Sequence, residues 1–220
     1  MNALTGKIVL VTGAGKGVGR RIAQALAARG AFVAANDISP VNLDPVVAEI
    51  NAAGGRARAY IHDIAKKVDV QSMINILSDE FGRIDILVNC AHVAPRAGLL
   101  ELDEWDLHRV FEVNAIGTLL MMQSVGRVMR AQGGGIIVNV INIPPDAPAS
   151  FIASRAGMVA LTQRAAAELG ARGIRLFTVT GELPHSADSL TEKVLSICED
   201  DFRTPKSPDF GLADTSNPEI

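Results

Sequence analysis

The sequence predicts an α/β domain built on a doubly wound, Rossmann-like parallel sheet of about six strands with helices on both faces. Two observations predict this class. First, short apolar runs rich in Val, Ile and Leu alternate along the chain with longer segments of helical period. Strands buried on both faces consist of such runs, and parallel strands require helical crossovers between them. Second, glycines follow the helical segments, where left-handed C-terminal caps form.

The expected elements follow one another in a regular order. The strands are expected at 7–11, 31–36, 57–61, 84–89, 136–141 and 174–179. The helices are expected at 20–28, 41–53, 66–81, 102–131 and 150–171, with one short helix at 189–198. Caps are expected at Gly30, Gly54, Gly82, Gly133 and Gly173. Residues 1–199 are therefore predicted to form a single dinucleotide-binding domain, and the polar residues 200–220 a flexible tail.

Composition excludes several classes of partner. The 220 residues are 48% hydrophobic and carry a net charge of −3, so no basic field favours nucleic acid or an anionic membrane. The apolar runs are too short to span a membrane, and the N-terminus lacks a signal peptide's apolar core. Cys90 and Cys198 are isolated, which fits a cytoplasmic protein without disulfides or a metal site.

A glycine-rich turn joins the first strand to the first helix, with the sequence Thr12-Gly13-Ala14-Gly15-Lys16-Gly17-Val18-Gly19. Such glycines let the backbone approach a pyrophosphate, and the N–H groups and dipole of the helix N-terminus stabilise its charge. Asp37 closes the next strand, at about the 20-residue spacing of a carboxylate that binds a ribose 2′-hydroxyl. These features predict a dinucleotide site. The alternative is a structural turn with a helix-capping Asp37.

The same carboxylate predicts which cofactor is preferred. Asp37 would accept a hydrogen bond from the ribose 2′-hydroxyl of NAD(H) and would repel the 2′-phosphate of NADP(H). Lys16 opposes this preference, because a basic residue in the turn often accompanies the phosphorylated cofactor. Since the carboxylate meets the 2′ position directly, NAD is the predicted cofactor and NADP is less favoured.

Several separated motifs occur in a fixed order along the chain. They are Thr12-Gly13-x-x-x-Gly17-x-Gly19, Asp63 after the third strand, Asn89-Cys90-Ala91-His92, Val113-Asn114-Ala115-Ile116-Gly117, Ile137-Val138-Asn139-Val140 and Gly173-Ile174-Arg175. In this order they resemble the short-chain dehydrogenase/reductase family from about Leu4 to Gly181. The resemblance implies NAD(P)-dependent oxidoreductase chemistry. It also implies that the cofactor is bound by Gly13, Lys16, Gly17, Val18, Gly19, Asp37, Asp63, Ile64, Asn89, Ala91 and Arg155.

The resemblance fails at the catalytic positions. The family uses Asn, Ser, Tyr and Lys there, and the equivalent positions in this chain are Asn114, Asn142, Phe151 and Arg155, of which only Asn114 is unchanged. Phe151 has no exchangeable proton, and general acid–base catalysis typically supplies about 10²–10⁴-fold in rate. Arg155 keeps a positive charge without the compact geometry of an ammonium. The Asn142 amide can donate a hydrogen bond, but its donor atom lies at a different distance from the backbone than a serine hydroxyl.

These substitutions predict an NAD(H)-binding protein with a degenerate active site that acts as a sensor, scaffold or partner subunit. One alternative is an active NAD(P)-dependent oxidoreductase with an unconventional proton donor, for which His185 is the foremost candidate. Another is a redox-independent enzyme on the same fold. His92 replaces a family glycine and is expected to crowd the cofactor ribose or stack against it. The family commonly dimerises through two long helices, here Leu102–Ala131 and Ala149–Ala171, so a homodimer is expected.

Overall fold

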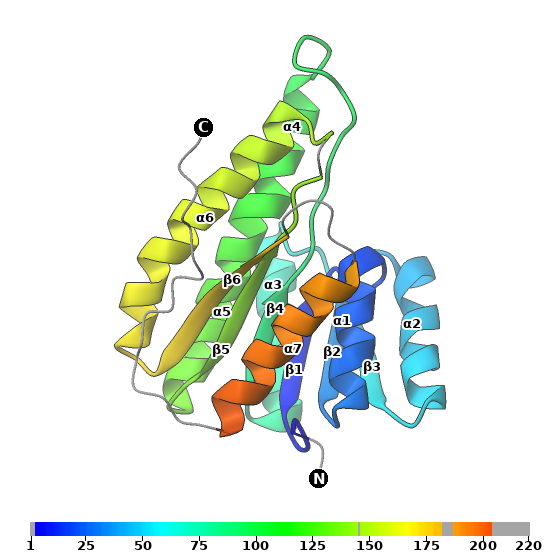
Figure 1. Ribbon diagram of the computed structural model, residues 1–220, viewed down its shortest axis with the longest axis vertical. Helices are drawn as coiled ribbons and strands as arrows, with labels where there is room; N and C mark the ends of the chain where they lie inside the picture. Colours follow the sequence, from blue (N-terminus) through cyan, green and yellow to red (C-terminus); the bar gives the residue numbers. More distant parts are fainter. Residues whose placement is uncertain (1–2, 145, 182–186, 204–220) are drawn as a thin grey trace.

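The computed structural model describes residues 3–144, 146–181 and 187–203, with side chains up to residue 200. Its centre is a six-stranded parallel sheet of order β3-β2-β1-β4-β5-β6 (Figure 1). The strands are β1 (Ile8–Thr12), β2 (Phe32–Asp37), β3 (Arg56–Ile61), β4 (Ile86–Asn89), β5 (Gly135–Ile141) and β6 (Ile174–Thr180). The predicted fold class is thus confirmed.

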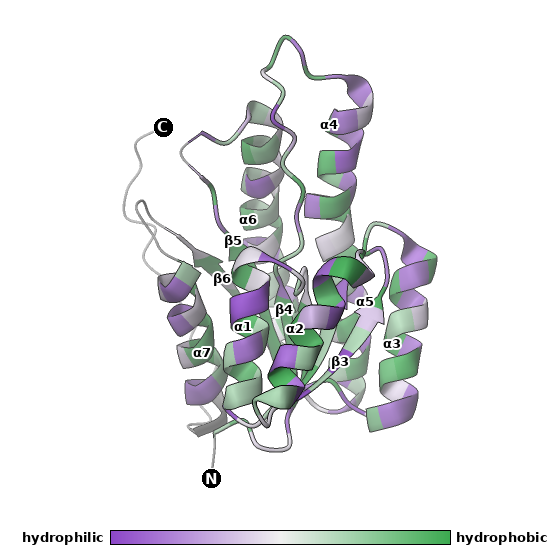
Figure 2. Ribbon diagram, turned by 90° about the vertical axis from the view of Figure 1, so that its right-hand side faces the viewer, coloured by the Kyte–Doolittle hydropathy of each residue, from purple (hydrophilic) through white to green (hydrophobic). Residues whose placement is uncertain are grey.

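Helices cover both faces of this sheet. One face packs against α1 (Gly17–Ala28), α2 (Pro40–Ala52) and α7 (Ala187–Arg203). The other packs against α3 (Lys67–Phe81), α5 (Thr118–Ala131) and α6 (Ala149–Gly170). Successive β1 residues alternate between the two cores: Val9 and Val11 belong to the first, and Leu10 to the second. In Figure 2 most helices carry both hydrophilic and hydrophobic residues, as expected when one side packs on a sheet.

The single long helix expected over 102–131 is a wrong prediction. The segment is divided into α4 (Glu104–Phe111), a π-helical stretch (Glu112–Gly117) and α5. The buried Asn114 lies in the widened turn, where its carboxamide binds the backbone of Val93. A π-helical turn carries an extra residue, and such turns frequently occur at functional sites.

Four of the five predicted glycine caps are confirmed, because Gly30, Gly54, Gly82 and Gly133 directly end their helices with φ between 67° and 91°. Gly173 also has a positive φ, of 74°, but it lies in the turn two residues after Ala171, the C-cap of α6. Helix α7 is longer than the predicted 189–198 and continues to Arg203, four residues into the predicted tail. Residues 204–220 lie outside the described part of the chain. Within that part, no helix is long and apolar enough to cross a membrane.

The strand order reverses beside β1, since β2 and β3 lie on one side of it and β4, β5 and β6 on the other. In sheets of this kind, ligands bind at the carboxyl ends of the strands on either side of such a reversal. Helix α4 extends beyond that edge (Figures 1 and 2). The reversal therefore fixes where the candidate site should lie.

Candidate functional site

The glycine turn packs closely against the end of β4. A Cβ atom at Gly19 would lie 2.2 Å from the Gly13 carbonyl oxygen, and one at Gly13 would lie 2.7 Å from the Ala91 Cα. Gly13 and Gly17 also have positive φ, of 66° and 53°. The Thr12 hydroxyl oxygen accepts backbone N–H groups of Cys90 and Ala91 at 3.2 and 3.3 Å. These contacts hold the first turn of α1 at the mouth of the crevice.

The N-terminus of α1 suits an anion. Among the described residues, no side chain caps this end of the helix, so its first N–H groups remain available. Lys16 directly precedes the first turn and is exposed, while Gly17, Val18 and Gly19 form it. Backbone donors of this kind, with the helix dipole behind them, fit a pyrophosphate.

Asp37 ends β2 beside this turn. Its Oδ2 accepts the Gly15 N–H at 3.1 Å, and its Oδ1 accepts the Ser39 N–H at 3.0 Å. The two bonds fix the orientation of the carboxylate, and each oxygen retains further acceptor capacity. The exposed Ile38 follows Asp37 and also lines the pocket. A ribose hydroxyl could therefore bind Asp37 without displacing its protein partners.

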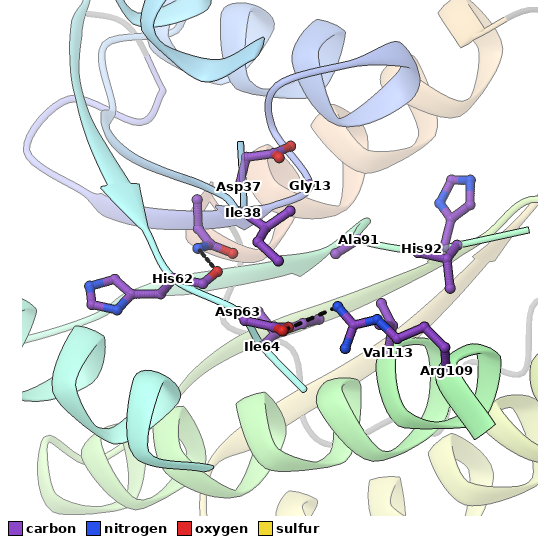
Figure 3. A pocket seen from close by; sticks show the side chains of 12 residues that line it. Gly13, Asp37, Ile38, His62, Asp63, Ile64, Ala91, His92, Arg109 and Val113 are labelled. Carbon is purple, nitrogen blue, oxygen red and sulfur yellow. Dashed lines mark hydrogen bonds and ion pairs between the residues drawn. The ribbon is translucent and has the colours of Figure 1, made fainter. Parts of the chain in front are cut away.

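An open pocket lies next to Asp37 at the carboxyl ends of β2, β3 and β4 (Figure 3). Its lining residues are Gly13, Asn36, Asp37, Ile38, His62, Asp63, Ile64, Ala91, His92, Val93, Arg109 and Val113. The pocket thus contains five of the predicted cofactor residues. Asn89 is buried in the sheet instead, where its amide donates to Asn139 Oδ1 at 2.8 Å.

Arg109 is a pocket residue that the sequence analysis missed. It reaches from α4 to Asp63, with Nη2 3.1 Å from Oδ2, and Figure 3 shows this ion pair along one side of the pocket. The other Asp63 oxygen accepts the Ala65 N–H at 3.0 Å. The two partners lie 46 residues apart in the sequence. No local motif connects them, and only the packing of α4 over the strand ends brings them together.

Asn114 connects three segments around the crevice. Its Oδ1 accepts the Val93 N–H at 2.8 Å, while its Nδ2 donates to the Val93 carbonyl at 3.0 Å and to Ser154 Oγ at 3.1 Å. Ser154 Oγ in turn donates to the Phe151 carbonyl at 2.7 Å. Every polar atom of the Asn114 side chain is therefore occupied. In this arrangement Asn114 positions α6 against the loop after β4.

Phe151 and Arg155 lie together on α6. The guanidinium carbon is 4.9 Å from the centre of the phenyl ring, and the two residues are only 1% and 3% exposed. The His92 ring meets Phe151 edge-on, with 5.7 Å between the ring centres. These three residues are called the Phe151 cluster below. Of its members only His92 also lines the open pocket, so it marks the boundary between the pocket and the buried pair.

The electrostatics of the Phe151 cluster are unusual. Burial lowers the pKa of Arg155 to about 10, and its Nε has no hydrogen-bond partner among the described residues. Burial raises the pKa of the neighbouring Cys90 thiol to about 12, and the Arg155 charge partly opposes this. Arg155 is thus a buried cation next to a thiol that stays protonated at neutral pH. Burying an uncompensated charge is costly, so this environment favours an anionic ligand group.

His92 is held in one tautomer. Its Nδ1 lies 2.9 Å from the Cys90 carbonyl oxygen, which can only accept, so Nδ1 carries the proton. His92 is exposed, yet partial desolvation of its ring lowers the pKa of His92, the Arg155 charge lowers it further, and the bond to Cys90 opposes both. The neutral ring therefore keeps a lone pair on Nε2. Figure 3 places this ring away from the Asp63–Arg109 pair.

Asn142 follows β5 and lies beside the end of β6, where its Oδ1 would be 3.0 Å from a Cβ at Gly181. No hydrogen bond joins it to Phe151 or Arg155 in the described part of the chain. His185, the candidate proton donor, lies outside the described residues. The four positions predicted to match the family's catalytic residues therefore divide into one connected set, Asn114, Phe151 and Arg155, and a separate Asn142.

Comparison with known proteins agrees with this geometry. Residues 7–184 match the family model described as short chain dehydrogenase. The chain is 39% identical over 193 residues to D-threitol dehydrogenase of Mycolicibacterium smegmatis, covering 84% of this chain and 74% of that protein. A metagenomic short-chain oxidoreductase solved with NADP superposes with a TM-score of 0.86 at 27% identity, covering 92% of this chain and 95% of that one.

A second solved structure is NAD⁺-bound xylitol dehydrogenase, with a TM-score of 0.76 and 31% identity over 80% of this chain and 70% of that one. The family model covers most of the chain, and the two dehydrogenases resemble the chain in sequence, at 39% and 31% identity, while the xylitol dehydrogenase also shares its fold. This chain belongs to the short-chain dehydrogenase/reductase family.

Proposed function

We propose that the chain is an NAD(H)-binding protein with a degenerate active site, without normal dehydrogenase turnover, and that it acts as a sensor, scaffold or partner subunit. One observation carries the proposal: Phe151 stands where the family has its proton donor, and it is packed beneath His92 and against Arg155. The retained glycine turn and Asp37 support binding of the cofactor.

In this proposal the residues divide between binding and chemistry. The first turn of α1 would receive the pyrophosphate, Asp37 the ribose hydroxyls, and Asp63 with Arg109 the adenine side of the pocket. The carboxylate of Asp37 would disfavour a 2′-phosphate, so NAD(H) is proposed over NADP(H). The bound nicotinamide would supply hydride chemistry.

Hydride transfer to a carbonyl also needs a proton at the substrate oxygen. Phe151 has none to give. Arg155 retains its proton at neutral pH even with a pKa of about 10. The Asn114 amide is occupied by Val93 and Ser154. Losing a positioned acid typically costs about 10²–10⁴-fold in rate.

The test combines binding with turnover. The full chain is titrated with NADH and NAD⁺ by calorimetry, and NADH formation or loss is followed at 340 nm against a panel of polyols, alcohols and ketones. Binding without turnover is expected. The double variant Phe151→Tyr with Arg155→Lys, with Asn142→Ser added in a third protein, tests the local cause. Robust turnover by the unmodified chain would contradict the proposal.

A second candidate is an active oxidoreductase with an unconventional proton donor. The dehydrogenase names of the relatives support it, as does the lone pair of the neutral His92 ring beside Phe151. That ring would act as a base for alcohol oxidation. Turnover abolished by His92→Gln would identify this base, whereas turnover abolished by His185→Ala would identify His185.

We further propose a cytoplasmic homodimer formed through the α4–α5 region and α6. Large apolar side chains are exposed on these segments, namely Trp105 (72%), Ile116 (48%) and Ile152 (44%). Exposed apolar groups of this size favour a protein interface. Light scattering at micromolar concentration should give twice the chain mass, and a monomeric mass would contradict the dimer.

A further inference from the structure

We propose that this site selects the adenosine diphosphate part of a nucleotide, and that the Phe151 cluster excludes the nicotinamide half. Ligands of the ADP class would then bind at least as tightly as NADH, which would be held by its ADP part alone. The inference rests on the nucleotide site proposed above and specifies its ligand class.

The first argument is the position of the open pocket. The cofactor half that binds Asp37 must lie over β2 and β3, and the pocket lies there, lined by residues from the ends of these strands and by Arg109 from α4. The other half would extend from the pyrophosphate across β4 toward β5 and α6. On the side of the open pocket that faces α6, the lining includes His92, and the ring of His92 already contacts Phe151.

The second argument is burial. Phe151 and Arg155 are 1% and 3% exposed, and the neighbouring Asn114 and Ser154 are fully buried. Their mutual contacts fill this side of the crevice: a cation against an aromatic ring, an edge-on imidazole, and the Asn114–Ser154 bond. A nicotinamide could enter only if His92 moved away and the buried pair were uncovered. The free-energy cost of that rearrangement would offset the favourable binding energy of the nicotinamide ring.

The third argument is charge. Arg155 is a buried cation whose Nε has no partner among the described residues, and no carboxylate contributes to its shifted pKa. A terminal phosphate near this end of the site would gain from that charge. The reduced nicotinamide ring is neutral, and the oxidised ring is itself a cation. Arg155 therefore favours ADP over NADH, and NADH over NAD⁺.

Calorimetric titration of the full chain tests the inference with five probes. ADP-ribose lacks only the nicotinamide of NADH, so this pair isolates the ring. Affinities within about threefold of each other are expected for these two, with ADP equal or tighter, NAD⁺ weaker than NADH, and no heat from nicotinamide mononucleotide at millimolar concentration. NADH binding more than about tenfold tighter than ADP-ribose would overturn the inference while leaving the proposed nucleotide site intact.

Two variants sharpen the test. His92→Ala should uncover the boundary and raise the affinity for NADH about fivefold relative to ADP-ribose, with ADP unchanged. The control is His108→Ala, because His108 is an exposed residue of α4 that lies 3.8 Å from Glu104, and every affinity should stay unchanged. An unchanged NADH to ADP-ribose ratio in His92→Ala would overturn the role of His92. Failure of all adenosine nucleotides to bind the unmodified chain would overturn the proposed function itself. The five titrations of the unmodified chain distinguish a failure of the inference from a failure of the proposed function, even if a variant misfolds.

Discussion

Replacing Asn114 by alanine is expected to lower the free energy of unfolding by about 2–5 kcal/mol. The magnitude follows from its contacts. Three hydrogen bonds are lost, two to the Val93 backbone and one to Ser154 Oγ, at distances of 2.8–3.1 Å. Each contributes about 0.5–1.5 kcal/mol net, and a buried partner left without a bond costs about 1–3 kcal/mol. Asn114 itself is fully buried, so water cannot easily replace these bonds.

Urea unfolding followed by circular dichroism measures this change. For a domain of this size, a loss of about 2–5 kcal/mol corresponds to a drop of about 4–20 °C in the melting temperature. The matched control is Asn75→Ala, because Asn75 makes one exposed hydrogen bond with Gln71 on the same helix. That control should change stability by less than about 0.5 kcal/mol. A loss below about 1 kcal/mol for Asn114→Ala would refute the inference that Asn114 positions α6.

Asp37→Ala should weaken binding of all adenosine nucleotides and narrow the preference for NADH over NADPH, measured by calorimetry; an unchanged NADPH to NADH ratio would show that Asp37 does not meet the 2′ position. Cys90 and Cys198 are buried, and the pKa of Cys90 is raised to about 12, so a thiol reagent at pH 8 should label both only after unfolding. Because the pKa of His92 is lowered from 6.5, the unfolded chain takes up this proton first, and stability should fall as pH drops below about 6.5. His92→Gln should remove that part of the loss, and an identical pH profile in the variant would disprove the assignment.

The architecture could be predicted because it depends on local patterns. Apolar runs identify strands that are buried on both faces, and the glycine caps need only the left-handed backbone that other residues avoid. The glycine turn and Asp37 were predictable for the same reason, since both belong to one strand–turn–helix–strand unit. The structure places Asp37 against Gly15 as that unit requires.

The features that were missed depend on contacts between distant segments. The π-helical stretch exists where Asn114 binds Val93, 21 residues earlier, and nothing in the periodicity of residues 102–131 indicates that bond. In the sequence, Arg109 has the pattern of a solvent-exposed helix residue. In the structure α4 packs over the strand ends, and Arg109 forms an ion pair with Asp63. The sequence predicted that Phe151 and Arg155 replace the expected catalytic pair. It could not show that the two would pack on each other.

That packing gives a physical reason for the two predicted substitutions to occur together. On α6 the residues are one helical turn apart, and the guanidinium lies over the phenyl ring, where the negative face of the ring partly offsets the cost of burying the charge. An ammonium, more strongly hydrated than a guanidinium, would be harder to bury there. A phenol introduced alone by Phe151→Tyr would have its ring beneath Arg155, whose guanidinium lacks the compact geometry of the family's ammonium. Restoring proton transfer therefore requires the side chain at 155 to change as well, which is why the double variant tests the proposed loss of activity.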